Sequence, residues 1–228
     1  MKPSISNENS FEDAIEELFF NLDYDCYCGY DIERDEHNPL YMDELRDNLQ
    51  IINPELPPET ITEAINIIQT FEAGSLEEKN DKFMNYLQNG VKTSYLENNE
   101  DINVNVNLID FENPLNNQFT AIRQWTVVEH QNKRPDVVVF VNGIPLVVIE
   151  LKSPSREDVD SSNGYRQINT YKEVIPSLFY YNAFCVISDP AMSKAGTITA
   201  NEDRYMQWKT VDGNYEDTRY AAFDVLFE

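Results

Sequence analysis

Residues 135–152 constrain the fold of this chain more than any other stretch of its sequence. They run Pro-Asp-Val-Val-Val-Phe-Val-Asn-Gly-Ile-Pro-Leu-Val-Val-Ile-Glu-Leu-Lys, so two almost wholly apolar runs flank the dipeptide Asn142-Gly143. Each run has the length of a strand, and Asn-Gly between such runs is a strong short-range signal for a β-hairpin. Because the runs contain so few polar residues, both strands are expected to be central in a sheet and buried on both faces.

Charged residues stand at the ends of this hairpin. Asp136 opens the first run, and Glu150 and Lys152 close the second. Ions at the ends of buried strands usually have a partner or a metal, because removing an ion from water costs several kcal/mol. Two carboxylates beside an ammonium would make a compact site for a divalent cation, an arrangement suited to metal-dependent nuclease chemistry. Solvated strand ends are the alternative explanation of the same pattern.

The pairing register of the hairpin decides between these explanations. Side chains alternate along a strand, so Glu150 and Lys152 share one face of the sheet. A regular two-residue turn would place Asp136 opposite Ile149 and send its side chain to the other face. The site therefore requires an odd-length loop, in the simplest case residues 142–144, or a β-bulge. Gly143 can supply the left-handed residue that such a loop needs.

The rest of the sequence predicts an α/β protein with a mixed β-sheet flanked by helices. Residues 1–90 are expected to form a helical part that packs on a core made by residues 91–228. Helices are predicted over 11–22 with Ser10 as N-cap, 40–50, 58–71, 75–90 with a Ser75/Glu78 capping box and a stop at Gly90, and 163–175. Strands are predicted over 102–109, 119–129, 136–141, 145–152, 183–188 and 197–200.

The cysteine content and the apolar stretches indicate the cellular compartment in which the protein is expected. Three cysteines, Cys26, Cys28 and Cys185, make an odd number without zinc-site spacing, which favours buried free thiols in a reducing compartment. The sequence shows neither a signal peptide nor an apolar stretch long enough for a membrane span, so a cytoplasmic protein is expected. The apolar run at 221–228 lacks a terminating turn, which suggests a fragment of a longer polypeptide.

Several stretches together resemble a known family. The Pro135-Asp136 and Glu150-x-Lys152 pair matches the PD-(D/E)xK nuclease signature, which is weakly specific alone. The longer text is more specific and includes Leu108-Ile-Asp-Phe-Glu-Asn-Pro-Leu-Asn-Asn-Gln-Phe, residues 134–154, Tyr165-Arg-Gln-Ile-Asn-Thr-Tyr-Lys and Tyr181-Asn-Ala-Phe-Cys-Val-Ile-Ser-Asp. It resembles the N-terminal nuclease domain of the restriction (R) subunit of type I restriction–modification enzymes, over about residues 8–210. The resemblance implies a restriction-endonuclease-like PD-(D/E)xK core.

The resemblance also implies roles for particular residues. Asp136, Glu150 and the backbone carbonyl of Leu151 would bind Mg²⁺, and Lys152 would orient or help deprotonate the attacking water. A Gln-x-x-x-Tyr motif after the catalytic lysine is expected to help place DNA, and it corresponds to Gln167 and Tyr171. An additional acid on the first helix corresponds best to Glu12, with Glu16 as its rival; a solvated helix face explains both equally well.

The expected function is cleavage of foreign, unmethylated double-stranded DNA, in a complex with methyltransferase and specificity subunits. ATP would act only through motor domains absent from this chain, which has no Gly-x-x-x-x-Gly-Lys-Ser/Thr loop. Two alternatives stay open: a catalytically silent docking module of the same fold, and a nuclease of another defence system. The two histidines, His37 and His130, offer little to a His-based hydrolase.

The net charge of the chain is strongly negative, which is unusual for a DNA-binding protein. Its net charge is −24, whereas a free-standing DNA-binding protein is usually basic. DNA is therefore expected to be delivered by other domains and to touch only a local basic strip around the hairpin. The candidates for this strip are Arg123, Lys133, Arg134, Lys152, Arg156, Arg166 and Lys172. The remaining acidic surface is predicted to repel misplaced DNA.

Overall fold

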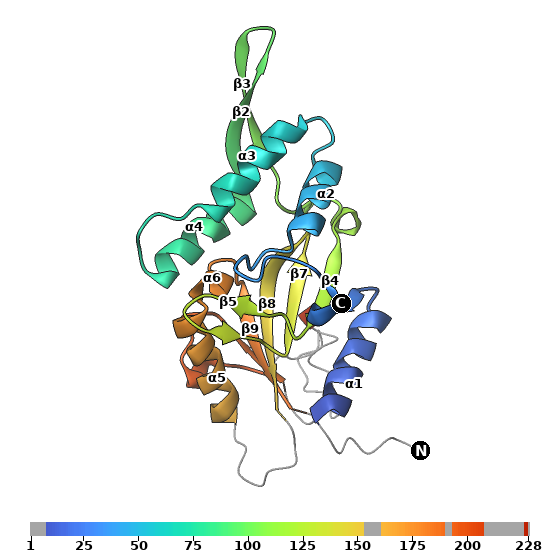
Figure 1. Cartoon of the computed structure of the whole chain (residues 1–228), viewed down its shortest axis with the longest axis vertical. Coiled ribbons are helices and arrows are strands. Elements are labelled where there is room, and N and C mark those ends of the chain that lie inside the picture. The colour runs from blue at the N-terminus through green and yellow to red at the C-terminus, as the bar shows by residue number, and fades with distance from the viewer. Residues whose placement is uncertain (1–7, 153–160, 190–192, 208–225, 228) are drawn as a thin grey trace.

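A mixed sheet forms the centre of the protein, as the sequence predicts, and it has six strands (Figure 1). The computed structural model describes residues 8–152, 161–189, 193–207 and 226–227. The strands, in spatial order, are β1 (Asp25–Cys28), β4 (Phe119–Arg123), β7 (Val137–Val141), β8 (Ile144–Leu151), β9 (Phe184–Ser188) and β10 (Ser193–Gly196). The β1–β4 and β8–β9 pairs are parallel, and the other neighbours are antiparallel. The β7–β8 hairpin therefore lies in the middle of the sheet.

Helices cover both faces of this sheet. One core contains side chains of α1 (Glu8–Asn21), α2 (Met42–Ile52), α3 (Pro58–Gln69) and α4 (Leu76–Asn89), and the other contains side chains of α5 (Ser161–Val174) and α6 (Pro176–Phe179). Val137 and Val139 of β7 face the first core, whereas Val138 and Phe140 face the second. This alternation of buried residues on both faces is what an unbroken apolar strand predicts. Figure 1 shows α1 and α5 on opposite sides of the sheet.

A second hairpin, β2 (Val91–Glu97) with β3 (Glu100–Val106), projects from the body beside α3 (Figure 1). The chain enters it from α4, which begins with the predicted Ser75/Glu78 capping box and ends at Gly90 in a left-handed conformation (φ 75°). The smaller elements are β5 (Val127–Val128), β6 (Asn132–Lys133) and the 3₁₀ turns Gly29–Asp31, Pro114–Asn116 and Glu202–Arg204.

The β7–β8 hairpin contains a bulge, one of the two solutions that the sequence allows. Val141 pairs with Ile144, so the loop is the two-residue Asn142-Gly143 turn, and the expectation of a three-residue loop is wrong. The register then shifts between Val139 and Phe140. As a result Leu146 and Val147, although consecutive, both face the same core. Left-handed φ angles of 52° and 77° at Asn142 and Gly143 suit a two-residue turn, so the extra residue is accommodated within the strand.

Several predicted boundaries differ from the structure. Residues 1–90 are not purely helical, because β1 lies among them at the edge of the sheet; its sequence, Asp-Cys-Tyr-Cys, lacks a clear apolar alternation. Ser10 lies inside α1, which begins at Glu8, so it is not the N-cap. The strand predicted over 119–129 ends at Arg123 because Gln124 adopts a left-handed conformation. The strand predicted over 197–200 is instead β10, at Ser193–Gly196.

Two composition-based expectations concern cysteines and membranes. All three cysteines are free, but only Cys185 is buried, and Cys26 and Cys28 on β1 are half-buried. Among the helices of the described segments, none has the length and apolar character needed to cross a membrane.

Candidate active site

The β7–β8 hairpin brings Asp136, Glu150 and Lys152 together at one end of the sheet. The last printed pair of the ladder is Val137 with Ile149, so the bulged register places Asp136 opposite Glu150. The backbone N–H of Leu151 donates to Oδ2 of Asp136 at 2.7 Å. Nζ of Lys152 donates to Oε1 of Glu150 at 2.6 Å. The Glu150 side chain is only 6% exposed and that of Lys152 21%, so this ion pair is largely shielded from water.

Helix α5 adds a third element to the site. The hydroxyl of Tyr171 donates to Oε2 of Glu150 at 3.1 Å, and the side chain of Gln167 is hydrogen-bonded to Tyr171. The two residues are four apart on the helix and therefore adjacent on its surface. Tyr171 belongs to the core on the α5 face of the sheet, the face toward which Val138 and Val148 also point. Both carboxylate oxygens of Glu150 thus have a defined partner.

The electrostatics of the site work against two ionised carboxylates. Burial, followed by the charge of Glu150, raises the pKa of Asp136 to about 8, even though the Leu151 N–H lowers it. The charge of Glu12 raises this pKa further and that of Lys152 lowers it. Burial and Glu150 also raise the pKa of Tyr171, so its hydroxyl keeps the proton that it donates. A pKa that is raised by burial and by a neighbouring like charge is typical of functional sites.

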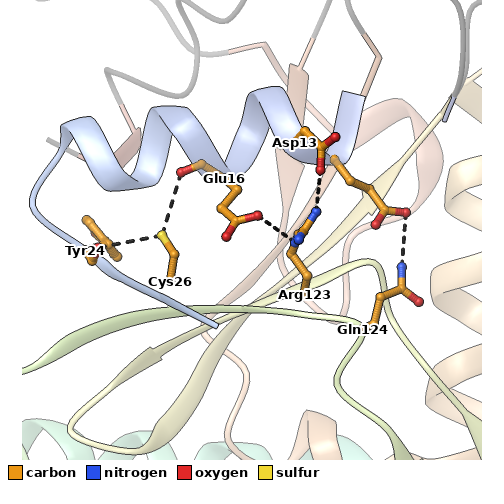
Figure 2. A network of polar contacts seen from close by, with 7 residues as sticks. Asp13, Glu16, Tyr24, Cys26, Arg123 and Gln124 are labelled. Atoms are coloured by element: carbon orange, nitrogen blue, oxygen red, sulfur yellow. Dashed lines mark hydrogen bonds and ion pairs between the residues drawn. The ribbon is translucent and has the colours of Figure 1, made fainter. Parts of the chain in front are cut away.

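Of the two acids considered on α1, Glu12 is the one that acts on Asp136. Nε2 of Gln124 donates to Oε1 of Glu12 at 3.1 Å. Glu16 instead pairs with Nε of Arg123 at 2.8 Å, and Asp13 pairs with Nη1 of the same arginine at 2.7 Å. Figure 2 shows Arg123 between Asp13 and Glu16, with Gln124 beside it. Sequence reasoning missed Gln124, whose contacts depend on the packing of α1 against the end of β4.

The donor atoms at this site fit Mg²⁺. Mg²⁺ is usually held by one or two carboxylates and several waters, and Asp136 and Glu150 supply two facing carboxylates. The Leu151 N–H points toward Asp136, and the carbonyl of a strand residue points to the same side as its N–H. A divalent cation would also offset the repulsion that raises the pKa of Asp136. In the part of the chain that the structure describes, no three His, Cys, Asp or Glu side chains form a metal-binding group, so backbone and water would have to complete the coordination.

Several cations of the predicted basic strip are engaged by other parts of the fold. Arg123 is engaged by α1, as described above. The guanidinium of Arg134 stacks 4.9 Å from the ring centroid of Tyr30. Nζ of Lys172 donates to the carbonyl of Ile198 at 2.8 Å. Arg156 lies outside the described residues, and Arg166 is exposed on α5. Of the described candidates, Lys152 is the one that contacts the site carboxylates.

The family of the chain follows from comparison with known proteins. Residues 5–204 match the family model described as "Type I restriction enzyme R protein N terminus". The HindI endonuclease subunit of Haemophilus influenzae, named as a type I restriction enzyme, is 32% identical over 96% of this chain and 22% of its own length. The EcoprrI endonuclease subunit of Escherichia coli is 35% identical over 44% of this chain and 32% of its own length. The chain thus spans about a fifth to a third of these curated relatives, and it belongs to the family of type I restriction enzyme R protein N termini.

Proposed function

We propose that this chain is the Mg²⁺-dependent DNA endonuclease domain of a type I restriction enzyme R subunit. The observation that carries the proposal is the β-bulge in β8, which sets Asp136 opposite Glu150, the partner of Lys152. A regular two-residue hairpin would separate these groups onto two faces. The names of the relatives, which are endonuclease subunits, support the same reaction class.

Each residue has a proposed role in hydrolysis of the phosphodiester bond. Asp136, Glu150 and the Leu151 carbonyl would hold Mg²⁺, whose contribution is to stabilise the negative charge that develops on the phosphate. Lys152 would orient the attacking water and steady that charge with its ammonium group. Tyr171 fixes the orientation of Glu150 through the hydrogen bond to Oε2. Gln167, hydrogen-bonded to Tyr171, would help to place the DNA strand.

The biological setting is proposed from the family. The substrate would be double-stranded, unmethylated DNA in the cytoplasm, and the partners would be methyltransferase and specificity subunits. ATP-driven translocation would belong to the part of such a subunit outside this chain, since the chain aligns with 22% of the HindI subunit. DNA would then be brought to the site by other domains, which fits a domain with a net charge of −24.

Substitution in the assembled enzyme tests the proposal. Asp136→Ala and Lys152→Ala are each expected to reduce DNA cleavage at least about 100-fold, because each removes a group that holds the metal or the water. ATP hydrolysis should continue at the wild-type rate, since these residues lie outside the motor. The matched controls are Asp101→Asn and Lys92→Ala on the projecting hairpin, both exposed, which should leave both activities unchanged.

Undiminished cleavage by both site variants would instead support a catalytically silent docking module of the same fold. Loss of ATP hydrolysis together with cleavage would show that the substitutions disrupt assembly, and would also count against the proposed roles.

A further inference from the structure

Gln124 has a backbone conformation that its residue type disfavours. Its φ of 57° lies in the left-handed region. The other described non-glycine residues with positive φ are all Asp or Asn, namely Asp23, Asn98, Asn99 and Asn142, whose short polar side chains tolerate this region. Glutamine has no such advantage. Strained conformations of this kind persist where the surrounding structure enforces them, and they concentrate at functional sites.

Three contacts hold Gln124 in place. Its backbone N–H donates to the carbonyl of Asp136 at 2.9 Å. Its own carbonyl lies so close to Gly29 that a Cβ there would approach to 2.5 Å. Its side-chain amide donates to Oε1 of Glu12 at 3.1 Å. One residue therefore joins Asp136, which directly precedes β7, to the segment that follows β1 and to α1.

We infer that Gln124 is a positioning residue for the site: its amide holds the Glu12 carboxylate at the end of the sheet where Asp136 and Glu150 converge. This inference rests on the proposed nuclease function. The packing of α1 alone does not bring Glu12 to the site, because α1 lies on the face of the sheet opposite to Tyr171. Glu12 must reach the site around the end of β4, and the left-handed turn at Gln124 is located there.

Arg123 and Gln124 contact different side chains of α1. Arg123 holds the helix through Asp13 and Glu16, as Figure 2 shows. Gln124 orients a single side chain, Glu12, whose negative charge lies near that of Asp136. When Asp136 is ionised, as a metal ligand is, repulsion between the two carboxylates would drive them apart without this hydrogen bond. Removal of the Gln124 amide is therefore expected to disturb Glu12 and leave the helix docked.

Gln124→Gly separates the side chain from the backbone, because glycine adopts the left-handed conformation without strain. In the full-length subunit, assembled with its partners, we expect DNA cleavage to fall by roughly 10- to 100-fold, the usual loss when a hydrogen-bonding residue that supports a metal site from outside its ligand set is removed. Mn²⁺ binding to the nucleotide-free subunit, measured by electron paramagnetic resonance, should weaken by about tenfold. The Tm should change by less than about 4 °C, because relief of the strain offsets the added freedom of glycine in the unfolded chain and the lost hydrogen bond.

Two comparisons make this result specific. Asn99→Gly introduces glycine at another left-handed position (φ 66°), on the exposed tip of the β2–β3 hairpin, and it should change neither cleavage nor Mn²⁺ binding. If Gln124 acts through Glu12, adding Gln124→Gly to Glu12→Gln should cause no further loss of cleavage.

Wild-type cleavage and Mn²⁺ binding in Gln124→Gly would overturn the inference. Additive losses in the double variant, or a lowered Tm with lost ATP hydrolysis, would overturn it as well, since they indicate a role in folding. Asp136→Ala distinguishes a failure of the proposed nuclease function from a failure of the inference about Gln124. If that variant cuts DNA normally, the proposed function falls and the inference falls with it; if it is inactive while Gln124→Gly is active, only the inference fails.

Discussion

Glu44 is a half-buried carboxylate at the end of the β7–β8 hairpin opposite to Asp136. It lies on α2 and accepts hydrogen bonds from the hydroxyl of Thr120 at 2.9 Å and from the N–H of Gly143 at 3.1 Å. Burial raises its pKa to about 7 from the usual 4.5, although both hydrogen bonds act in the opposite direction. The contact between α2 and the hairpin turn therefore depends on the protonation state of one side chain.

This pKa predicts a pH-dependent stability. Between pH 4.5 and 7 the folded chain binds a proton at Glu44 that the unfolded chain has released, so the contribution of Glu44 is complete below pH 4.5 and is lost as the pH rises through 7. Glu44→Gln removes this dependence. Relative to wild type, the free energy of unfolding of the variant should increase by on the order of 2 kcal/mol from pH 5 to pH 8. Urea titrations of both proteins at several pH values measure the difference, and parallel pH profiles would contradict the prediction.

At the scale of single residues, the sequence predicts which groups stand at the ends of the hairpin. Asp136, Glu150 and Lys152 can be placed because strand alternation and pairing register are properties of the local sequence. Gln124 and Glu44 cannot be found in this way. The hydrogen bond from Gln124 to Glu12 spans 112 positions in the chain and that from Thr120 to Glu44 spans 76, so both depend on how the helices pack.

At the scale of elements, the two hairpins make a contrasting pair. Both have two-residue turns with residues in the left-handed region, Asn142-Gly143 in one and Asn98-Asn99 in the other. The Asn142 side chain is fully buried: its Oδ1 accepts from the N–H of Gln118, and its Nδ2 donates to the carbonyl of Leu108 and to Oδ1 of Asn117. Asn99 is exposed.

Asn142→Asp should therefore destabilise the protein by about 2–4 kcal/mol, because a carboxylate would face two acceptors in a buried position. Asn99→Asp, the matched change at the exposed turn, should alter stability by less than about 0.5 kcal/mol. The free energy of unfolding of each variant, from urea titration, provides the comparison. Equal effects of the two substitutions would show that the buried network around Asn142 contributes nothing beyond the turn itself.

Elements were predictable where one local signal decided them. The capping box at Ser75 and the left-handed Gly90 fix both ends of α4 within its own sequence. The bulge in β8 could be named as one of two options, but the choice depended on the surroundings of the turn. A Cβ on Gly143 would lie 2.4 Å from the carbonyl of Tyr41, so α2 packs directly against this turn. Strand β1 escaped prediction because four residues at the edge of a sheet carry little periodic signal.

At the scale of the whole molecule, one group of acidic residues lies far from the candidate site. The β2–β3 hairpin packs beside α3 and projects from the body of the protein (Figure 1). The α2 region contacts the Asn142-Gly143 turn, and Asp136 lies at the other end of the β7–β8 pair, so the β2–β3 hairpin is remote from Asp136. Its tip carries Glu97, Glu100 and Asp101, all exposed. Glu97 pairs directly with Glu100, and like charges in this position are mutually unfavourable. These three acidic residues therefore give no evident gain in folding stability. This is consistent with a role in the negative electrostatic potential around the protein.

Charge reversal at this tip tests whether the acidic surface repels misplaced DNA. Replacing Glu97, Glu100 and Asp101 by Lys changes the net charge from −24 to −18 and leaves the repulsion between positions 97 and 100 in place. Nonspecific binding of double-stranded DNA to this chain should tighten several-fold at about 50 mM salt and converge with wild type near about 500 mM, where screening is strong. The neutral set Glu97→Gln, Glu100→Gln and Asp101→Asn should give an intermediate affinity, and Tm should change little in either variant. If the lysine variant binds DNA no better than the neutral set at low salt, the acidic hairpin has no part in keeping DNA away, and the net charge of the chain would need another explanation.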